Sequence, residues 1–375
     1  MKAYCLFILL LSQAYLGKEI EFTFKIVTLK PTVSQAEWDD YKEGLATIKE
    51  PKTDYNVLVY LLQDVKGINE GQFEDDLGLT AGYHVKKFVD GDFATILAFQ
   101  SEDVDGGKDS VTEALFNDVK VIKNEKVDGA QFVHIECQEM HYLFVNTDLN
   151  PDEEKANQEF QDIYSKITGI RNEVNYGTAD VTEIYKKNKG KFPDEDDYVS
   201  IVWAGSFTKS IPRDDETQAA FKADAANEEL DFDAFAEKVK GWVKGGTGPL
   251  ANWEKRDAAD YEAREDKFEK LGKTIFKELE INFEPSRGYS TKKDADEEGG
   301  GFVNKEEMSY TDRILYFTST TKDEFKDYTL VKDCNVSTSK PVAMIIHDVQ
   351  DYDDHSERLR KARKLSLVDR IKDFL

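Results

Sequence analysis

The sequence has few of the residues that cross-link or interrupt a chain. Its 375 residues include three cysteines and eight prolines. So few cysteines exclude the dense disulfide framework of small secreted domains. Hydrophobic residues make up 40% of the chain and aromatic residues 12%, which is enough for a sizeable core. We therefore expect a globular protein that is stabilised by packing, built as one large domain or two small ones.

Positive charge is also scarce. Lysine and arginine total 50 residues against 75 aspartates and glutamates, which gives a net charge of -25. The long-range field of such a chain repels nucleic acid and anionic membrane surfaces. We expect neither as a partner of the protein body, although a small local basic site remains compatible with this charge.

Long apolar runs are missing as well. Cys5 to Leu11 forms a short one, too short to span a bilayer, and it follows Lys2 and precedes small residues up to Ala14 and Gly17. This pattern predicts a signal peptide over residues 1–17 and a secreted, extracellular protein. In that compartment, Asn335-Val-Ser is a sequon that predicts glycosylation of Asn335.

Alternating or continuous apolar patterns predict strands over residues 20–27, 55–62, 94–99, 198–203 and 341–346. Residues 131–135 and 141–145 indicate a hairpin, and residues 34–49 and 151–170 indicate helices. A charged region over 214–276 has a helical pattern with a glycine-rich break at 245–248. Strands interleaved with helices argue for an α/β class. We expect one domain over residues 18–350, with the charged helical region as an elaboration.

The C-terminal segment 351–375 differs from the acidic body. From Ser356 to Leu375 it has seven Lys or Arg and three Asp or Glu, and apolar residues recur at helical spacing. This predicts a basic amphipathic helix. Packing against the acidic body is the ordinary role of such a helix. The alternative is a helix for a partner or a membrane surface, and it is the only membrane contact that we expect.

Two segments near the C-terminus carry the functional signal. Residues 308–315 are Met-Ser-Tyr-Thr-Asp-Arg-Ile-Leu, and residues 337–342 are Ser-Thr-Ser-Lys-Pro-Val. They resemble the Pro-Ala-Trp-x-Asp-Arg-Ile-Leu and Ser-Asp-His-Lys-Pro-Val motifs of the inositol polyphosphate 5-phosphatases, in the endonuclease/exonuclease/phosphatase superfamily. The resemblance covers about residues 21–349. It implies a DNase I-like two-sheet sandwich flanked by helices, with the site at one end of the strands.

The resemblance implies a substrate side that is partly kept. Asp312 and Arg313 match the family motif, and an arginine held by a carboxylate is a pre-aimed phosphate clamp. The alternative is a structural ion pair at the start of a strand. Lys340 also matches, and Arg287 could replace the charge of a phosphate-binding lysine whose place is taken by Gly288. Asp312, Arg313, Lys340 and Arg287 are the ligand-binding residues that we expect.

The catalytic side departs from the family. Thr338 and Ser339 stand where the motif has Asp and the general-base His, and a hydroxyl cannot replace imidazole near neutral pH. Further substitutions at family positions are Lys30, Asp148, Ser206 and Thr208. Asp64 is a shortened carboxylate at a metal position. Lys30 could take the place of the cation and pair with Asp64. Beside this lysine, Asp64 and Asp148 are weak candidate ligands for Mg²⁺.

Three functions remain open. The first is a secreted, catalytically inactive relative that binds a small anionic, phosphate-bearing ligand or a protein partner, without a cofactor. The second is a residual metal-dependent phosphatase acting on inositol phosphates or phosphoinositides, with Mg²⁺ among Asp64, Asp148 and Asp312. The third is a haem or small-ligand carrier, because the same fold holds haem through a cysteine thiolate in blood-feeding insects. The candidate haem ligands are Cys137, His84, His134 and His141. On this fold Cys137 and Cys334 lie too far apart to pair, so we expect two thiols.

Overall fold

The computed structural model describes most of the predicted domain. The described residues are 20–31, 55–101, 116–137, 140–176, 199–207, 215–227, 231–245, 247–248, 278–289, 308–317, 324–331 and 339–350, with the single residues Gln35, Trp38, Ile48, Phe276, Lys305 and Cys334. The predicted signal peptide, the C-terminal helix and most of the helix over 34–49 lie outside the described residues. Thr208, Asn335 and Thr338 also lie outside them.

The strands are β1 (Ile20–Leu29), β2 (Val57–Gln63), β3 (Tyr83–Asp90), β4 (Phe93–Gln100), β5 (Lys120–Val127), β6 (Ala130–Cys137), β7 (Met140–Asp148), β8 (Val199–Ser206), β9 (Asp312–Phe317), β10 (Glu324–Leu330) and β11 (Val342–Gln350). The helices are α3 (Phe73–Asp76), α5 (Glu153–Tyr176), α7 (Asp215–Ala225) and α8 (Phe232–Gly245). Every strand predicted from the sequence is present. The sequence patterns missed β3, β5 and β10, and β9 was expected only as the strand start in the alternative reading of Asp312 and Arg313.

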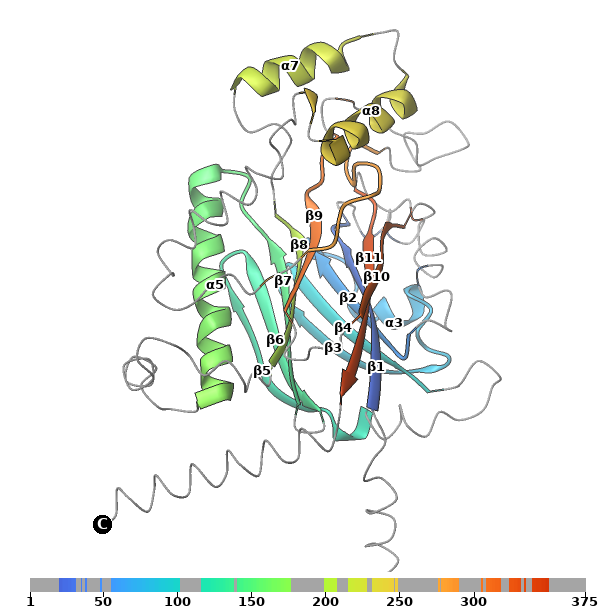
Figure 1. Ribbon diagram of the computed structural model, residues 1–375. Coiled ribbons are helices and arrows are strands. Elements are labelled where there is room, and N and C mark those ends of the chain that lie inside the picture. The colour runs from blue at the N-terminus through green and yellow to red at the C-terminus, as the bar shows by residue number, and fades with distance from the viewer. Residues whose placement is uncertain are drawn as a thin grey trace, which may run out of the picture.

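The strands form two mixed sheets that pack against each other (Figure 1). One has six strands in the order β10-β11-β1-β2-β4-β3, and the other has five in the order β5-β6-β7-β8-β9. The pairs β1/β2 and β7/β8 are parallel, and all other neighbours are antiparallel. The predicted fold class, an α/β two-sheet sandwich flanked by helices, is confirmed.

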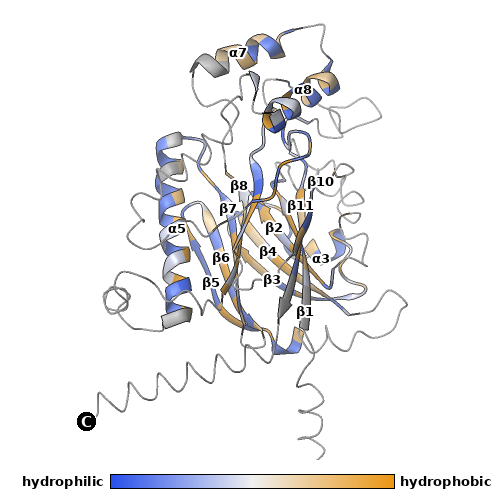
Figure 2. Ribbon diagram, in the orientation of Figure 1, coloured by the Kyte–Doolittle hydropathy of each residue, from blue (hydrophilic) through white to orange (hydrophobic). Residues whose placement is uncertain are grey.

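Alternation along each strand divides the core into three clusters. Residues such as Phe24, Val59 and Phe144 fill the space between the sheets. The other face of the six-stranded sheet packs against α3, around Phe73. The other face of the five-stranded sheet packs against α5, around Trp203 and Phe160, whose ring centroids are 4.7 Å apart. Hydrophobic colour follows these buried strands in Figure 2.

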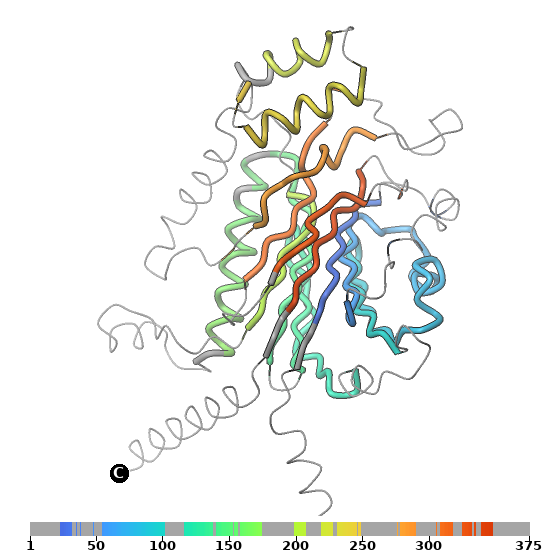
Figure 3. Tube along the Cα trace, turned by 45° about the vertical axis from the view of Figure 1, so that its right-hand side comes forward, coloured from blue at the N-terminus to red at the C-terminus, as the bar shows by residue number. Residues whose placement is uncertain are grey.

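One end of the sandwich holds the polar residues of interest. At this end, called the upper end below, β1, β2, β7 and β8 finish while β9 and β11 begin, as Figure 3 also shows. The helices α7 and α8 lie beyond it and are joined by the buried rings of Phe221, Phe235 and Trp242. They confirm helical structure in the described part of the charged region. Among the described residues, no helix is both long and apolar enough to cross a membrane.

Both described cysteines are buried. Cys137 lies at the β6–β7 turn, opposite Met140, at the lower end of the sandwich. Cys334 belongs to the outer cluster of the six-stranded sheet. No disulfide joins them, which confirms the expected pair of thiols.

Candidate functional site

Below the upper rim, the inward-facing positions of five strands change from apolar to polar. The residues share nearly complete burial and lie between the two sheets; they are Thr28, Gln63, Thr95, Gln131 and Asn146. Buried polar groups destabilise a core unless they are hydrogen-bonded. These residues therefore bond to one another across the sandwich, and the layer they form is called the amide layer below.

Asn146 lies at the centre of the amide layer. Its Nδ2 donates to the carbonyl oxygens of Leu62 and Ala94, at 2.8 and 3.1 Å, in the opposite sheet. Its Oδ1 accepts from Nε2 of Gln63 at 2.6 Å, and the same nitrogen donates to Thr28 Oγ1 at 3.1 Å. These bonds fix the two sheets relative to each other directly beneath the rim.

The rim is dominated by an ion pair between the two sheets. Lys30 follows β1, and its Nζ lies 2.8 Å from both carboxylate oxygens of Asp148 at the end of β7. Both side chains are mostly buried, at 24% and 18% exposure. Lys30 thus pairs with Asp148, not with Asp64 as the sequence suggested.

Asp148 is held by its neighbours from several elements. The pKa of Asp148 is raised above its ordinary value, mainly by burial and further by the charge of Asp64. The charge and hydrogen bond of Lys30, and a hydrogen bond from Ser206, act in the opposite direction. Ser206 lies beside Asp148 in the β7/β8 register. Asp64 itself is exposed and has a positive φ of 57°, a conformation that aspartate tolerates better than most residues.

Asp312 lies in the same sheet as Asp148, on the other side of Ser206, where β9 pairs with β8. Its Oδ2 accepts hydrogen bonds of 3.1 Å from the hydroxyls of Ser286 and Thr311. Burial raises the pKa of Asp312 to about 6, although these two hydrogen bonds and the charge of Arg287 lower it. Among the described residues, the buried Oδ1 of Asp312 and the buried Nε of Arg287 have no hydrogen-bond partner.

Arg313 does not form the predicted clamp with Asp312. Successive residues of a strand point to opposite faces, so Arg313 turns away from Asp312. Its Nε lies 2.9 and 3.1 Å from the two oxygens of Glu278, and its Nη2 bonds the same carboxylate. Glu278 also accepts a 3.0 Å hydrogen bond from the Tyr328 hydroxyl. The structural ion pair, the alternative for Arg313, is what the structure shows, although its partner is Glu278.

Lys340 and Ser339 lie beside Arg287. Ser339 forms a β-bridge with Arg287, and the backbone N–H of Lys340 donates to the carbonyl of Ser286 at 2.7 Å. The ammonium of Lys340 lies 4.6 Å from the centre of the Tyr289 ring. The structure therefore brings Arg287, Lys340, Ser339 and Asp312 together around the 285–289 segment. Of the predicted site residues, Thr208, Asn335 and Thr338 lie outside the described residues.

The donor set fits Mg²⁺ poorly. The ion requires several oxygen ligands in octahedral order, but the oxygens of Asp148 already face an ammonium at hydrogen-bond distance. In the described part of the chain, no three histidine, cysteine or acidic residues are grouped to hold a metal ion. The structure gives the predicted Asp64–Asp148–Asp312 metal site no support.

The four candidate haem ligands do not share a pocket. Cys137 points into the apolar space between the sheets, and burial raises the pKa of its thiol to about 12, which opposes a thiolate ligand. His134 and His141 lie on the other face of the five-stranded sheet, with His134 Nε2 and His141 Nδ1 2.9 Å apart. His84 stacks on Phe116.

Sequence reasoning missed several site residues. Ser286 and Thr311, which hold Asp312, lie inside or beside the recognised motifs, so their position was available as a signal. Glu278 lies outside every motif, and nothing in the sequence linked it to Arg313. Asn146 was not predicted as a site residue; it lies beneath the rim, two residues before β7 ends at Asp148.

No protein-family model matches the chain, and no curated protein sequence matches it. Solved structures with a similar backbone course include the inositol polyphosphate 5-phosphatase domain of SPsynaptojanin, in complex with inositol (1,4)-bisphosphate and calcium ion. It shares 13% identity over 98% of each chain, with a TM-score of 0.48. Another is the Cimex nitrophorin ferrous NO complex, with 12% identity over 88% of this chain and 99% of that one, and a TM-score of 0.44. A third is TDP2 from C. elegans, with 10% identity over 87% and 76% and a TM-score of 0.40. At these identities and TM-scores, the similarities assign no function to this chain.

Proposed function

We propose that the protein is a secreted, catalytically inactive 5-phosphatase-like protein that binds a small anionic, phosphate-bearing ligand at its upper rim. The observation that carries the proposal is the Lys30–Asp148 pair. A fixed ammonium lies 2.8 Å from both oxygens of a carboxylate that the family resemblance places in the catalytic site. A lysine there supplies positive charge without a metal ion.

The loss of hydrolytic groups supports inactivity. Ser339 is a hydroxyl where the resemblance implies the general-base His, and Ser206 is one where it implies an Asp that polarises the attacking water. General acid–base catalysis contributes about 10²- to 10⁴-fold to rate, and loss of electrostatic stabilisers adds to that loss. The N-terminal signal pattern supports secretion.

Binding is supported by the cationic groups that remain near the rim. Arg287 is partly exposed, and its buried Nε has no hydrogen-bond partner among the described residues. Lys340 lies in the adjoining segment, and its backbone is held by Ser286. Guanidinium and ammonium groups are the usual partners of phosphate. Arg313 is no part of this set, because it turns away from Asp312 and bonds Glu278 instead.

Calorimetry and phosphate release on the same sample test both halves of the proposal. Soluble inositol polyphosphates serve as the probe, with EDTA in the binding experiment and Mg²⁺ in the assay. We expect binding that survives EDTA and no phosphate release. Lys30→Gln and Arg287→Gln should each weaken binding by about tenfold, equivalent to about 1.4 kcal/mol.

Lys120→Gln is the matched control. Lys120 forms a 2.8 Å ion pair with Glu136 on the β5–β6 hairpin, at the lower end of the sandwich. Removing it changes the net charge equally but should leave binding unchanged. Phosphate release at an enzyme-like rate would overturn inactivity and favour the residual metal-dependent phosphatase. Equal weakening by Lys30→Gln and Lys120→Gln would show a general charge effect and no site at the rim.

A further inference from the structure

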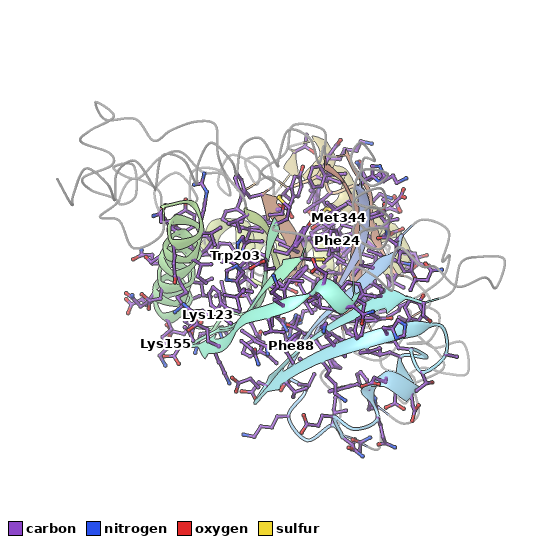
Figure 4. All side chains as sticks on the ribbon, turned by 90° about the horizontal axis from the view of Figure 1, so that it is seen from below. Phe24, Phe88, Lys123, Lys155, Trp203 and Met344 are labelled. Atoms are coloured by element: carbon purple, nitrogen blue, oxygen red, sulfur yellow. The ribbon has the colours of Figure 1, made fainter. Side chains whose placement is uncertain are left out.

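Two histidines lie on the face of the five-stranded sheet that α5 covers, close to the last turn of that helix. His134 in β6 is directly opposite Lys123 in β5, and the ammonium of Lys123 lies 3.5 Å from the carboxylate of Glu173 in α5. Figure 4 labels Lys123 at the edge of the sheet beside the helix. His141 in β7 is a diagonal neighbour of His134, which is opposite Leu143. His134 is only 3% exposed, whereas His141 is half-buried.

The two rings are hydrogen-bonded directly to each other. Nε2 of His134 and Nδ1 of His141 are 2.9 Å apart, and the ring centroids are 5.0 Å apart. A neutral imidazole has one donor and one acceptor nitrogen, whereas a protonated imidazole has two donors and no acceptor. The bond therefore persists when one of the two rings is protonated, and it cannot form when both are.

The surroundings of His134 oppose its protonation. Burial is the main cause, and the neighbouring His141 and Lys123 add to it, while Glu136 acts in the opposite direction. Together these groups lower the pKa of His134 to about 4. A second proton on the histidine pair is thus unfavourable for as long as His134 remains covered.

The charged side chains around the histidines come from β5, β6 and α5, and they form three ion pairs. Two of the pairs join β5 to α5 and one joins β5 to β6; they are Lys123–Glu173 at 3.5 Å, Lys166–Glu125 at 2.9 Å and Lys120–Glu136 at 2.8 Å. Each of these carboxylates already faces a lysine. They therefore offer little compensation for a doubly protonated histidine pair.

We propose that the His134–His141 pair is an acid-sensitive latch beneath the last turn of α5. The latch is closed while at least one ring is neutral. When both rings are protonated, the bond between them is lost and two positive charges meet on a covered face, so the end of α5 separates from the sheet and water reaches His134. The Lys123–Glu173 pair, whose carboxylate is 64% exposed, resists this separation only weakly. The latch lies at the lower end of the sandwich and does not depend on the proposed anion site.

Hydrogen exchange of the full-length protein at pH 7 and pH 5 tests the latch, after correction for the intrinsic effect of pH on exchange. The pKa of His134 is about 4 in the closed state and about 6.5, the ordinary value, once water reaches the ring. Because the closed state binds the proton less tightly, its stability is fully present above about pH 6.5 and is lost as the pH falls through about 4. We expect the opening that exposes the amides around Glu173 to be about twentyfold more populated at pH 5 than at pH 7.

His134→Gln is the test variant, because an amide keeps a hydrogen-bond acceptor for His141 but does not titrate in this range. The faster exchange at pH 5 should disappear in this variant. His84→Gln is the matched control, since His84 lies in β3 of the other sheet and stacks on Phe116. It should exchange as the natural protein does. No increase in the natural protein, or an equal increase in a folded His134→Gln, would overturn the proposal.

Nitrogen NMR of the imidazole rings in the unaltered protein decides the question even if His134→Gln folds poorly. We expect a ring-to-ring hydrogen bond at pH 7 and two protonated, unbonded rings below about pH 4. Two rings that are both protonated while α5 exchanges as slowly as at pH 7 would also contradict the latch.

Discussion

Asp312 and Arg313 are adjacent in β9, yet their side chains bind on opposite faces of the strand. Asp312 turns inward to Ser286 and Thr311, and Arg313 turns to Glu278 and Tyr328. The two residues that look like one phosphate clamp in the sequence therefore serve two different functions. One belongs to the rim of the site, and the other anchors the 278–289 segment to the sheet.

Removing the arginine should affect stability and leave ligand binding intact. Arg313→Met leaves Glu278 as a buried carboxylate without its cation, which typically costs about 3–5 kcal/mol. Urea unfolding measures this loss. The double variant Arg313→Met/Glu278→Leu should recover most of it, because both charges are then absent. Weaker binding of inositol polyphosphate by the stable double variant would instead show that Arg313 contributes to ligand binding.

The buried carboxyl of Asp312 predicts a pH-dependent contribution to stability. Its pKa of about 6 in the folded protein is higher than the usual value of about 3.9 in an unfolded chain. The folded state therefore holds the proton more tightly between these values. Protonation of Asp312 therefore contributes about 3 kcal/mol to the free energy of unfolding. This contribution is fully present below about pH 4 and is lost as the pH rises through about 6.

Asp312→Asn tests this dependence. The stability difference between Asp312→Asn and the natural protein should change by roughly this amount between pH 4 and pH 7, in favour of the variant at pH 7. Asp64→Asn is the control, since Asp64 is an exposed carboxylate at the same rim. Parallel pH profiles for the natural protein and Asp312→Asn would contradict the prediction.

Gly205 is required where β7 and β8 approach each other. It has a φ of 136°, and an added Cβ would lie 1.9 Å from the carbonyl oxygen of Thr147. Gly205→Ala must move the backbone beside Ser206, and we expect a loss of at least about 3 kcal/mol or failure to fold. Gly169 in α5 has no atom within 4 Å of its added Cβ. Gly169→Ala should therefore stabilise the protein by about 0.5–1 kcal/mol, as thermal unfolding can measure.

The amide layer predicts a large cost for a small polar change. Asn146→Ala removes two hydrogen bonds to carbonyl groups and leaves Nε2 of Gln63 with one acceptor fewer. At about 1 kcal/mol for each bond, plus the cost of unpaired buried groups, we expect a loss of about 3 kcal/mol. Asn124 is the comparison, because it is exposed and accepts one bond from Gln131. Asn124→Ala should change the free energy of unfolding by less than about 1 kcal/mol.

Strands with strong apolar patterns could be predicted from the sequence, and weak ones could not. The inner strands β2, β4 and β8 are buried along their whole length, so their sequences are nearly continuous apolar runs. In contrast, β5 is an edge strand in which Val121 and Ile122 are exposed and lysines stand at every third position. It forms a strand because it pairs with β6, and the intrinsic strand propensity of its residues does not predict that pairing.

The motif resemblance predicted which residues lie together at the rim, but it did not predict which ion pairs they form. Motif resemblance placed Lys30, Asp148, Ser206 and Asp312 together, and they do lie at one end of the sandwich. Which carboxylate each cation selects depends on strand register and on the facing direction of each side chain. A one-residue change reverses that direction. The Lys30–Asp148 and Arg313–Glu278 pairs each join segments far apart in the chain, and no spacing in the sequence encodes them.

The buried bonds of Asn146 make the shape of the protein independent of what its rim does. They bind the sheets to each other through backbone carbonyls, which every residue possesses, so they would persist whichever side chains stood above them. A chain built in this way can exchange a reactive rim for an inert or adhesive one and keep the same framework. Its architecture and its chemistry are thus free to diverge at different speeds.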